Sequence, residues 1–110
     1  MRVLLVDDVE VNRLTLVALL EEDGHQVVEA GSCADARAQL RAATFEVVLL
    51  DLGLPDGNGA SLIPDIRQQK GAKVVITSGS DVTGLAALVD GVITKGESYA
   101  AIQALLAGFA

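Results

Sequence analysis

The chain has few aromatic residues, a single cysteine and fewer basic than acidic residues. These shortages limit the composition of its core, its disulfides and its binding partners. Only 3% of the 110 residues are aromatic and none is tryptophan, whereas 51% are hydrophobic, so a core must be built from valine, leucine, isoleucine and alanine. Cys33 has no second cysteine with which to form an internal disulfide, which suits a reducing cytosol. We expect it to be a surface or half-buried thiol.

Basic residues and long hydrophobic runs are also scarce. The 8 lysines and arginines face 15 acids, and the net charge of -7 disfavours direct binding to nucleic acid or to an anionic membrane. The first apolar run, Val3 to Val6, is too short for a signal peptide, and acids follow it at once. A membrane-spanning helix needs about 20 apolar residues, and no stretch approaches that length. The sequence therefore predicts a cytoplasmic protein in which residues 1–110 form one domain.

Short aliphatic runs alternate with longer amphipathic stretches. Because the runs are apolar at successive positions, they indicate strands buried on both faces, as in a parallel sheet covered by helices on each side. Five such repeats predict an α/β fold with a doubly wound parallel sheet. The runs are Val3–Val6, Gln26–Val28, Val47–Leu50, Val74–Ile76 and Val92–Ile93, and the candidate helices lie near residues 9–23, 33–43, 59–69, 82–89 and 98–108.

The helix signals differ in strength. Ser32, with an acid three residues later, resembles a capping box for the second helix. Pro64 should kink the third helix or delay its start to about Leu62, because proline lacks a backbone donor. The fourth helix, flanked by Gly79 and Gly84, has the weakest pattern and is expected to be short.

The first helix has a distinctive outer face. At about 100° per residue, one side should pack on the sheet, while the opposite side carries small and apolar groups near its start. Such a face is either ordinary surface scatter or a docking face for a partner helix. The sheet-facing residues are Arg13, Leu16, Val17 and Leu20, and the outer ones are Val11, Asn12, Thr15, Ala18 and Glu22.

Reactive side chains follow four of the five aliphatic runs. Asp7 and Asp8 come after the first run, Asp51 after the third, Thr77 at the end of the fourth and Lys95 after the fifth. In open α/β sheets the functional crevice lies at the carboxyl ends of the strands. Acids at such positions often merely cap helices or face solvent. Five suitable groups at four strand ends favour a shared site instead.

This set of groups suits a cation and a phosphoryl group. Two carboxylates about 5 Å apart repel by about 3 kcal/mol at an effective dielectric constant of about 20. A divalent ion such as Mg²⁺ (or Mn²⁺) would relieve that repulsion and keep positions for water or phosphate oxygens. A carboxylate oxygen left free of metal can attack a phosphoryl group, whose charge Mg²⁺, the Lys95 ammonium and the Thr77 hydroxyl would neutralise.

These motifs resemble the response-regulator receiver domain of two-component signalling, in matching order and nearly matching spacing over almost the whole chain. The resemblance implies a flavodoxin-like (βα)5 fold with strand order 2-1-3-4-5. It rests on Asp7-Asp8, then Asp51-Leu52-Gly53-Leu54-Pro55-Asp56-Gly57-Asn58-Gly59, then Thr77, then Lys95.

The family's roles carry over to matching positions. Asp51 would be the phosphoacceptor, supplied by phosphohistidine on a histidine kinase or a histidine phosphotransfer protein. The chain would then be a participant in transfer to its own aspartate and not an enzyme with turnover. The resemblance implies Asp7, Asp8, Asp51 and the Gly53 carbonyl as ligands of Mg²⁺, with Thr77 and Lys95 on the phosphoryl oxygens.

The segment Asn12-Arg13, after the acid pair, resembles the corresponding segment of receivers associated with hybrid histidine kinases. In the family, the outer start of the first helix docks a histidine-bearing four-helix bundle. The resemblance therefore implies a partner face at Val11, Asn12, Thr15 and Ala18.

Three departures from the family fall in one region. Val92 stands where the family has an aromatic switch residue, Gly96 stands where proline usually follows the lysine, and 17 residues separate Thr77 from Lys95, about one helical turn fewer than usual. The phosphoryl-binding side chains are all present. We therefore expect phosphorylation to cause a conformational change that is small in this region or that occurs in another part of the domain.

Two alternatives stay open from the residues alone. A pseudo-receiver would signal by protein contact without phosphorylation, which the degenerate fourth-helix region favours. An enzyme, either a nucleotide-binding oxidoreductase or a phosphatase with an aspartate nucleophile, is less consistent with the motifs of the sequence. The turn Asp7-Asp8-Val9-Glu10 has neither a Gly-x-Gly pattern nor a P-loop, and Asp51 lacks a second aspartate two residues later.

Overall fold

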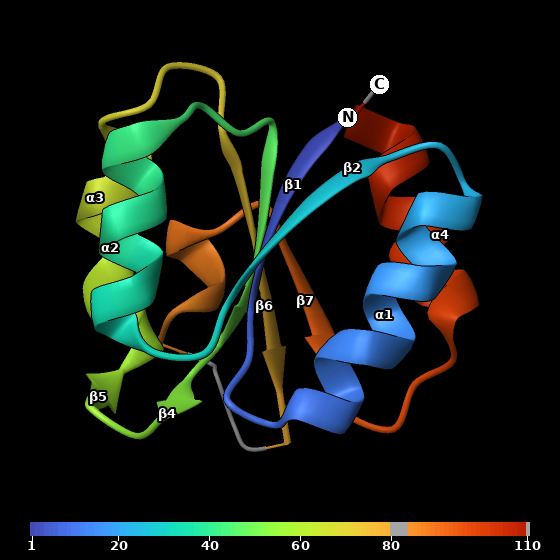
Figure 1. Cartoon of the computed structure of the whole chain (residues 1–110), viewed down its shortest axis with the longest axis horizontal. Helices are drawn as coiled ribbons and strands as arrows, with labels where there is room; N and C mark the ends of the chain where they lie inside the picture. The colour runs from blue at the N-terminus through green and yellow to red at the C-terminus, as the bar shows by residue number, and fades with distance from the viewer. Residues whose placement is uncertain (80–83, 110) are drawn as a thin grey trace.

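A computed structural model of the chain describes residues 1–79 and 84–109. Five parallel strands form one sheet in the order β2-β1-β3-β6-β7, with α2 and α3 on one face and α1 and α4 on the other (Figure 1). This confirms the predicted flavodoxin-like, doubly wound sheet. The strands are β1 (Arg2–Val6), β2 (Gln26–Ala30), β3 (Val47–Asp51), β6 (Lys73–Ser78) and β7 (Gly91–Thr94), and the helices are α1 (Glu10–Glu22), α2 (Cys33–Ala42), α3 (Ile63–Arg67) and α4 (Tyr99–Phe109).

Alternation along the strands divides the core into two aliphatic layers. In β1, Leu4 and Val6 pack on the α2 and α3 side, while Val3 and Leu5 pack on the α1 and α4 side. The central strand β3 is buried throughout. Burying one such side chain stabilises the fold by about 1.5–3 kcal/mol, so the aliphatic runs found in the sequence hold the sheet rigid beneath its carboxyl-terminal edge.

Helix α1 lies as its periodicity predicts. Leu20 is buried, and Arg13, Leu16 and Val17 are half-buried against the sheet. The opposite side is exposed at Val11, Asn12, Thr15, Ala18 and Glu22.

Helix α2 begins at the predicted cap. The Ser32 hydroxyl accepts a hydrogen bond from the Asp35 backbone N–H at 3.1 Å. The expectation for Cys33 is wrong, because its side chain is buried in the layer beneath α2. Burial raises the pKa of the Cys33 thiol, and the charge of Asp56 adds to the rise.

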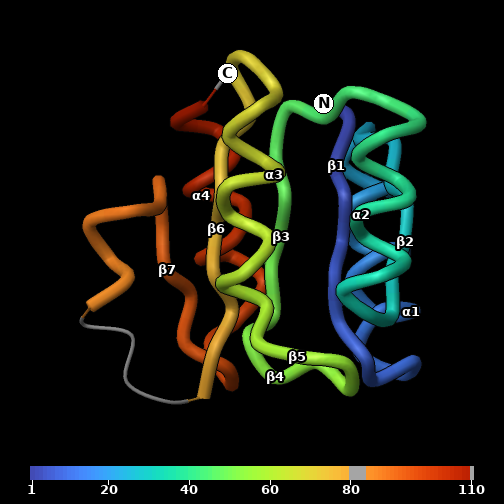
Figure 2. The backbone as a smooth tube through the Cα atoms, turned by 90° about the vertical axis from the view of Figure 1, so that its left-hand side faces the viewer, coloured from blue at the N-terminus to red at the C-terminus, as the bar shows by residue number. Residues whose placement is uncertain are grey.

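The third helical segment starts in the way that Pro64 predicts. A 3₁₀ helix, η1 (Gly59–Leu62), comes first, and α3 then begins at Ile63 with proline in its first turn, where a missing donor costs least. Between Asp51 and η1 the chain also forms a small antiparallel hairpin of β4 (Gly53–Leu54) and β5 (Gly57–Asn58), which was not predicted (Figure 2).

The prediction of a helix at residues 82–89 is wrong for the part that the structure describes. Residues 82 and 83 lie outside the described residues, and from Gly84 to Val89 the only helical turn is the 3₁₀ helix η2 (Ala86–Leu88). Arg67 of α3 donates to the Leu88 carbonyl of this turn at 2.9 Å. The next strand, β7, begins at Gly91. None of the helices described here is both long and apolar enough to cross a membrane.

Candidate functional site

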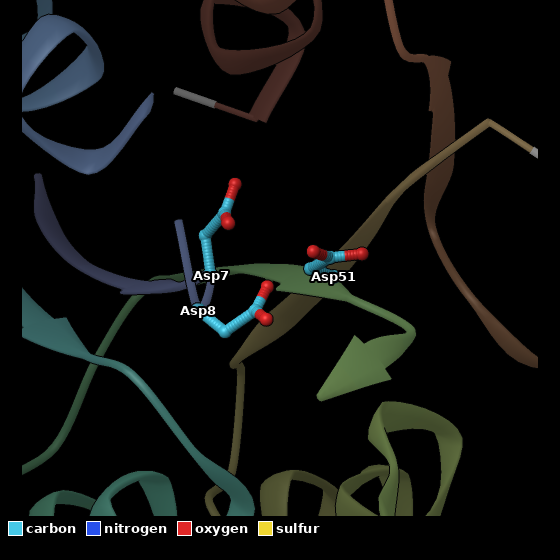
Figure 3. A group of neighbouring side chains, drawn as sticks. All are labelled: Asp7, Asp8 and Asp51. Carbon is cyan, nitrogen blue, oxygen red and sulfur yellow. The ribbon is translucent and has the colours of Figure 1, made fainter. Parts of the chain in front are cut away.

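Three carboxylates meet where β1 and β3 end. Asp7 and Asp8 follow β1, Asp51 is the last residue of β3, and the two strands are direct neighbours in the sheet. One oxygen from each side chain lies within 4.8 Å of the others (Figure 3). Asp7 and Asp51 are only 4% and 3% exposed, whereas Asp8 is exposed. The predicted acid cluster therefore exists, with one side open to solvent.

The donor set fits a divalent ion. Like charges this close and this buried repel strongly, and a single neighbouring ammonium does not balance three of them. Hard cations such as Mg²⁺ and Ca²⁺ prefer carboxylate and carbonyl oxygens, and Mg²⁺ keeps several waters among its ligands. The exposed flank at Asp8 leaves space for those waters or for phosphate oxygens.

Asp7 is fixed by three elements of the fold. Its Oδ1 accepts from the Val9 N–H at 2.8 Å, and its own N–H donates to the Ala30 carbonyl of β2 at 3.0 Å. Nη1 of Arg13 in α1 donates to the Asp7 carbonyl at 2.6 Å, while Nε of the same side chain lies 3.3 Å from Oε1 of Glu29. The guanidinium thus ties α1 to the backbone of the acid pair.

Asp51 has a defined partner for each carboxylate oxygen. Oδ1 accepts from the Gly53 N–H at 3.2 Å, and Oδ2 lies 3.0 Å from Nζ of Lys95. Gly59 packs directly on the Asp51 backbone, and a Cβ there would collide with the Asp51 carbonyl oxygen. Only glycine fits at that position, so the start of η1 and the phosphoacceptor candidate are packed as one unit.

The carboxylates keep Lys95 charged. The hydrogen bond to Asp51 raises the pKa of the Lys95 ammonium above its ordinary value, and partial burial lowers it by less. The negative charges of Asp51, Asp7 and Asp8 add to the rise. At neutral pH the site therefore contains a fixed cation beside the acid cluster.

Thr77 reaches the same edge from β6. It is paired in register with Asp51 and is half-buried. Thr77, Asp7 and Lys95 line a pocket of about 260 Å³, whose other walls come from α1, the turn after β7 and α4. The structure therefore brings together all the side chains expected to bind metal and phosphoryl group. Gly53 lies two residues beyond Asp51 in β4, and its carbonyl stays a predicted ligand.

The outer face of α1 borders this pocket. Asn12 and Thr15 line it, and the exposed surface continues along the helix over Val11, 66% exposed, and Ala18. Sequence reasoning missed Leu14, which is 56% exposed on the same side. Its spacing of three residues from Val11 and four from Ala18 was the available signal.

Two departures from the family lie in β7 and in the turn that follows it. Val92 is half-buried in the edge strand β7, and Gly96 adopts a φ of 97°, a left-handed conformation that glycine tolerates, in the turn after Lys95. Gly96 lines the pocket, whereas Val92 does not, and the acid cluster is intact.

Known proteins resemble the chain over most of its length. It is 40% identical over 102 residues to the DNA-binding transcriptional activator DevR/DosR of Mycobacterium tuberculosis, covering 89% of this chain and 46% of the relative. It is 44% identical over 69 residues to the sensor histidine kinase AruS of Pseudomonas aeruginosa, covering 63% of this chain and 7% of the relative. The chain thus spans less than half the length of either relative.

Solved structures show the same fold. A CheY-like receiver domain from Methylobacillus flagellatus superposes with a TM-score of 0.91 at 27% identity, covering 100% of this chain and 98% of the other. A response regulator from Burkholderia pseudomallei, described with a phosphorylated aspartic acid and a calcium ion, gives 0.86 at 30% identity over 96% of this chain and 65% of the other. The family model of the response regulator receiver domain matches residues 3–107, and the chain therefore belongs to the response regulator receiver domains of two-component systems.

Proposed function

We propose that residues 1–110 act as one phosphoacceptor receiver domain, in which Asp51 takes a phosphoryl group from a phosphohistidine. The observation that carries this proposal is the cluster of Asp7, Asp8 and Asp51 oxygens within 4.8 Å, with the Lys95 ammonium 3.0 Å from Asp51. Carboxylates this close together repel one another, and a purely structural role would be served better by less repulsive residues. The relative from Burkholderia pseudomallei, described with a phosphorylated aspartic acid, supports the same chemistry.

Each side chain of the site has a separate role in the proposed transfer. An oxygen of Asp51 attacks phosphorus, the O–P bond forms, and the P–N bond breaks with its electron pair returning to the imidazole of the donor. The Gly53 N–H orients Oδ1 during this step, while Lys95 exchanges its contact with Oδ2 for a phosphoryl oxygen. The Thr77 hydroxyl donates to a second phosphoryl oxygen.

The proposed ion ligands are Asp7, Asp8, Asp51 and the Gly53 carbonyl. Mg²⁺ (or Mn²⁺) held there would neutralise the carboxylates and the charge that develops on the phosphoryl oxygens. Asp7 is already fixed by bonds to Val9 and Ala30, so its oxygen is available without rearrangement.

The proposed partner is a histidine kinase or a histidine phosphotransfer protein that docks on α1. The face of Val11, Asn12, Thr15 and Ala18, extended by Leu14, lies beside the pocket that contains Lys95 and Thr77. A helical partner on this face would bring its histidine to the open side of the site. The match to part of the sensor histidine kinase AruS supports such a pairing.

Treatment with acetyl phosphate tests the function without a protein partner. With Mg²⁺ present, mass spectrometry should show one phosphoryl adduct on the intact protein. The adduct should be absent in Asp51→Ala and in wild type treated with EDTA. Failure of the wild type to gain an adduct at millimolar donor and Mg²⁺ would overturn the proposal, and an undiminished adduct in Asp51→Ala would refute the assignment of the acceptor.

A pseudo-receiver that signals by contact alone is the second candidate. It is favoured by the 3₁₀ helix η2 within the described part of the helix predicted at residues 82–89, and by Val92 in place of an aromatic residue. Such a module would bind its partner equally well with and without Mg²⁺ and acetyl phosphate. A change of affinity in their presence would exclude it.

A further inference from the structure

The β4–β5 hairpin is joined to the phosphoacceptor candidate at its base. Gly53 pairs with Asn58 across the hairpin, and the Gly53 N–H is also the donor to Oδ1 of Asp51. The Gly59 N–H, just past the hairpin, donates to the Leu52 carbonyl at 2.9 Å. A movement of this hairpin would therefore displace the donor that orients Asp51.

The tip of the hairpin is held by Asp56. Its Oδ1 accepts from the Cys33 backbone N–H at 2.8 Å and its Oδ2 from the Ala34 N–H at 3.0 Å. These are the first two backbone donors of α2, which lack partners within the helix. A single carboxylate thus joins the hairpin to a helix more than twenty residues earlier in the chain.

Further contacts and charges accompany this connection between the hairpin and α2. The hydrogen bonds from Cys33 and Ala34 lower the pKa of Asp56 below its ordinary value, so its carboxylate is charged at neutral pH. The hairpin also packs on the buried Cys33, whose Sγ lies 4.0 Å from the Asn58 carbonyl oxygen. The third backbone donor of the first turn, the Asp35 N–H, donates to the Ser32 hydroxyl and not to the hairpin.

We propose that Asp56 is a positioning residue for the phosphoacceptor site. By tying the hairpin tip to the start of α2, it keeps the Gly53 peptide against Asp51. Under the proposed function, on which this part of the inference rests, it also keeps the Gly53 carbonyl where it would complete the ion site.

Helix α2 supplies its own matched control. Asp56→Ala removes the bonds to Cys33 and Ala34 and frees the hairpin, whereas Ser32→Ala removes the remaining cap bond of the same turn and leaves the hairpin attached. Both variants weaken α2, so a loss that arises only from helix stability should occur in both. Asp56→Asn, which keeps one acceptor oxygen in the same place, should behave between Asp56→Ala and wild type and serves as the test variant if Asp56→Ala does not fold.

Two NMR readouts decide the inference. In the metal-free protein, the Gly53 amide proton shift should move toward the value of an unbonded amide in Asp56→Ala and stay in place in Ser32→Ala. In a titration with Mg²⁺ alone, Asp56→Ala should raise the dissociation constant by about tenfold, as is typical for residues that support metal ligands, while Ser32→Ala should change it less than about twofold.

The inference is overturned if Asp56→Ala leaves the Gly53 shift at its wild-type value, or if Ser32→Ala changes the shift and the Mg²⁺ affinity as much as Asp56→Ala does. A wild-type protein that binds no Mg²⁺ would refute the ion site of the proposed function. The Gly53 shift would then decide the role of Asp56 by itself, so the two failures are distinguishable.

Discussion

Nζ of Lys95 lies 3.0 Å from Oδ2 of Asp51, although their strands are not neighbours in the sheet. The lysine side chain spans the end of β6, which runs between β3 and β7. Its backbone N–H donates to the Ser78 carbonyl at 2.8 Å, which fixes the base of the side chain. This contact places a cation at the mouth of the acid cluster.

Lys95→Met should therefore separate ion binding from phosphoryl transfer. Removing a preorganised charge that faces the phosphoryl oxygens should slow phosphorylation by acetyl phosphate by about 100-fold. Affinity for Mg²⁺ should stay the same or rise, because a competing cation is lost. Rates from intact-protein mass spectrometry and a Mg²⁺ titration measure both. Equal rates in the variant and wild type would contradict the assigned role.

The same ion pair predicts a dependence of stability on alkaline pH. The folded protein raises the pKa of Lys95 above the ordinary value of 10.5, so the pair contributes stability that is fully present below that pH. The contribution is lost as the pH rises through the folded pKa. The free energy of unfolding in urea should therefore fall more steeply with alkaline pH in wild type than in Lys95→Met. Parallel curves would show that the pair contributes nothing.

Gly59 should not tolerate a methyl group. A Cβ at this position meets the Asp51 carbonyl, so Gly59→Ala must displace the backbone of β3 and should destabilise the protein by about 1–3 kcal/mol. Gly108→Ala is the matched control, because its Cβ would meet open space in α4 and should stabilise the helix by up to about 1 kcal/mol. Urea denaturation measures both changes. A stable Gly59→Ala protein would mean that the turn is not packed as described.

Asp23 joins the ends of two helices. Its Oδ2, just past α1, accepts from the Tyr99 hydroxyl at 2.8 Å and from Gln103 Nε2 at 2.9 Å, both in α4. The hydrogen bond from Gln103, followed by that from Tyr99, lowers the pKa of Asp23. The cluster therefore stabilises the fold above the ordinary value of 3.8 and loses that effect as the pH falls through the folded pKa.

Asp23→Asn should accordingly lose less stability than wild type when the protein is acidified below pH 3.8. Thermal unfolding as a function of pH measures the difference. The Tyr99→Phe variant, which keeps the ring and lacks the hydroxyl, should show a reduced acid dependence as well. If all three proteins lose stability in parallel, the contact between α1 and α4 has no part in the acid response.

The face of α1 should matter only for a protein donor. Leu14→Ser should slow phosphotransfer from a phosphorylated histidine kinase or phosphotransfer protein by about tenfold, equivalent to about 1.4 kcal/mol, and leave the reaction with acetyl phosphate unchanged. Leu88→Ser is the control, since Leu88 is 54% exposed against 56% for Leu14 and lies in η2 beside α3. If Leu88→Ser slows transfer as much as Leu14→Ser, the docking face is not on α1.

The sequence predicted the part of the site that follows from strand ends. Asp7, Asp8, Asp51 and Lys95 are found at one edge because parallel strands bring their carboxyl ends together, whatever the details of the loops. The face of α1 followed in the same way from helical periodicity, which also places the exposed Leu14 on that face.

The contacts that orient Asp51 did not follow from local patterns. No periodicity relates Asp56 to the first turn of α2, and the close packing of Gly59 on Asp51 depends on how a hairpin closes. The prediction of a helix at residues 82–89 was wrong for a related reason. Weak helical propensity near Gly84 predicts only a short helix, whereas the observed 3₁₀ turn is contacted by Arg67 from a different element, which no local pattern predicts.

Unfolding as a function of Mg²⁺ concentration tests the shared ion site most directly. The free energy of unfolding of the wild type should rise by about 1.4 kcal/mol for each tenfold increase of Mg²⁺ above its dissociation constant, at ionic strength held constant with NaCl. Asp8→Asn and Asp51→Asn, which each remove one carboxylate, should shift this rise to higher Mg²⁺. A wild-type stability independent of Mg²⁺, or a variant that responds to Mg²⁺ as the wild type does, would contradict an ion held jointly by these residues.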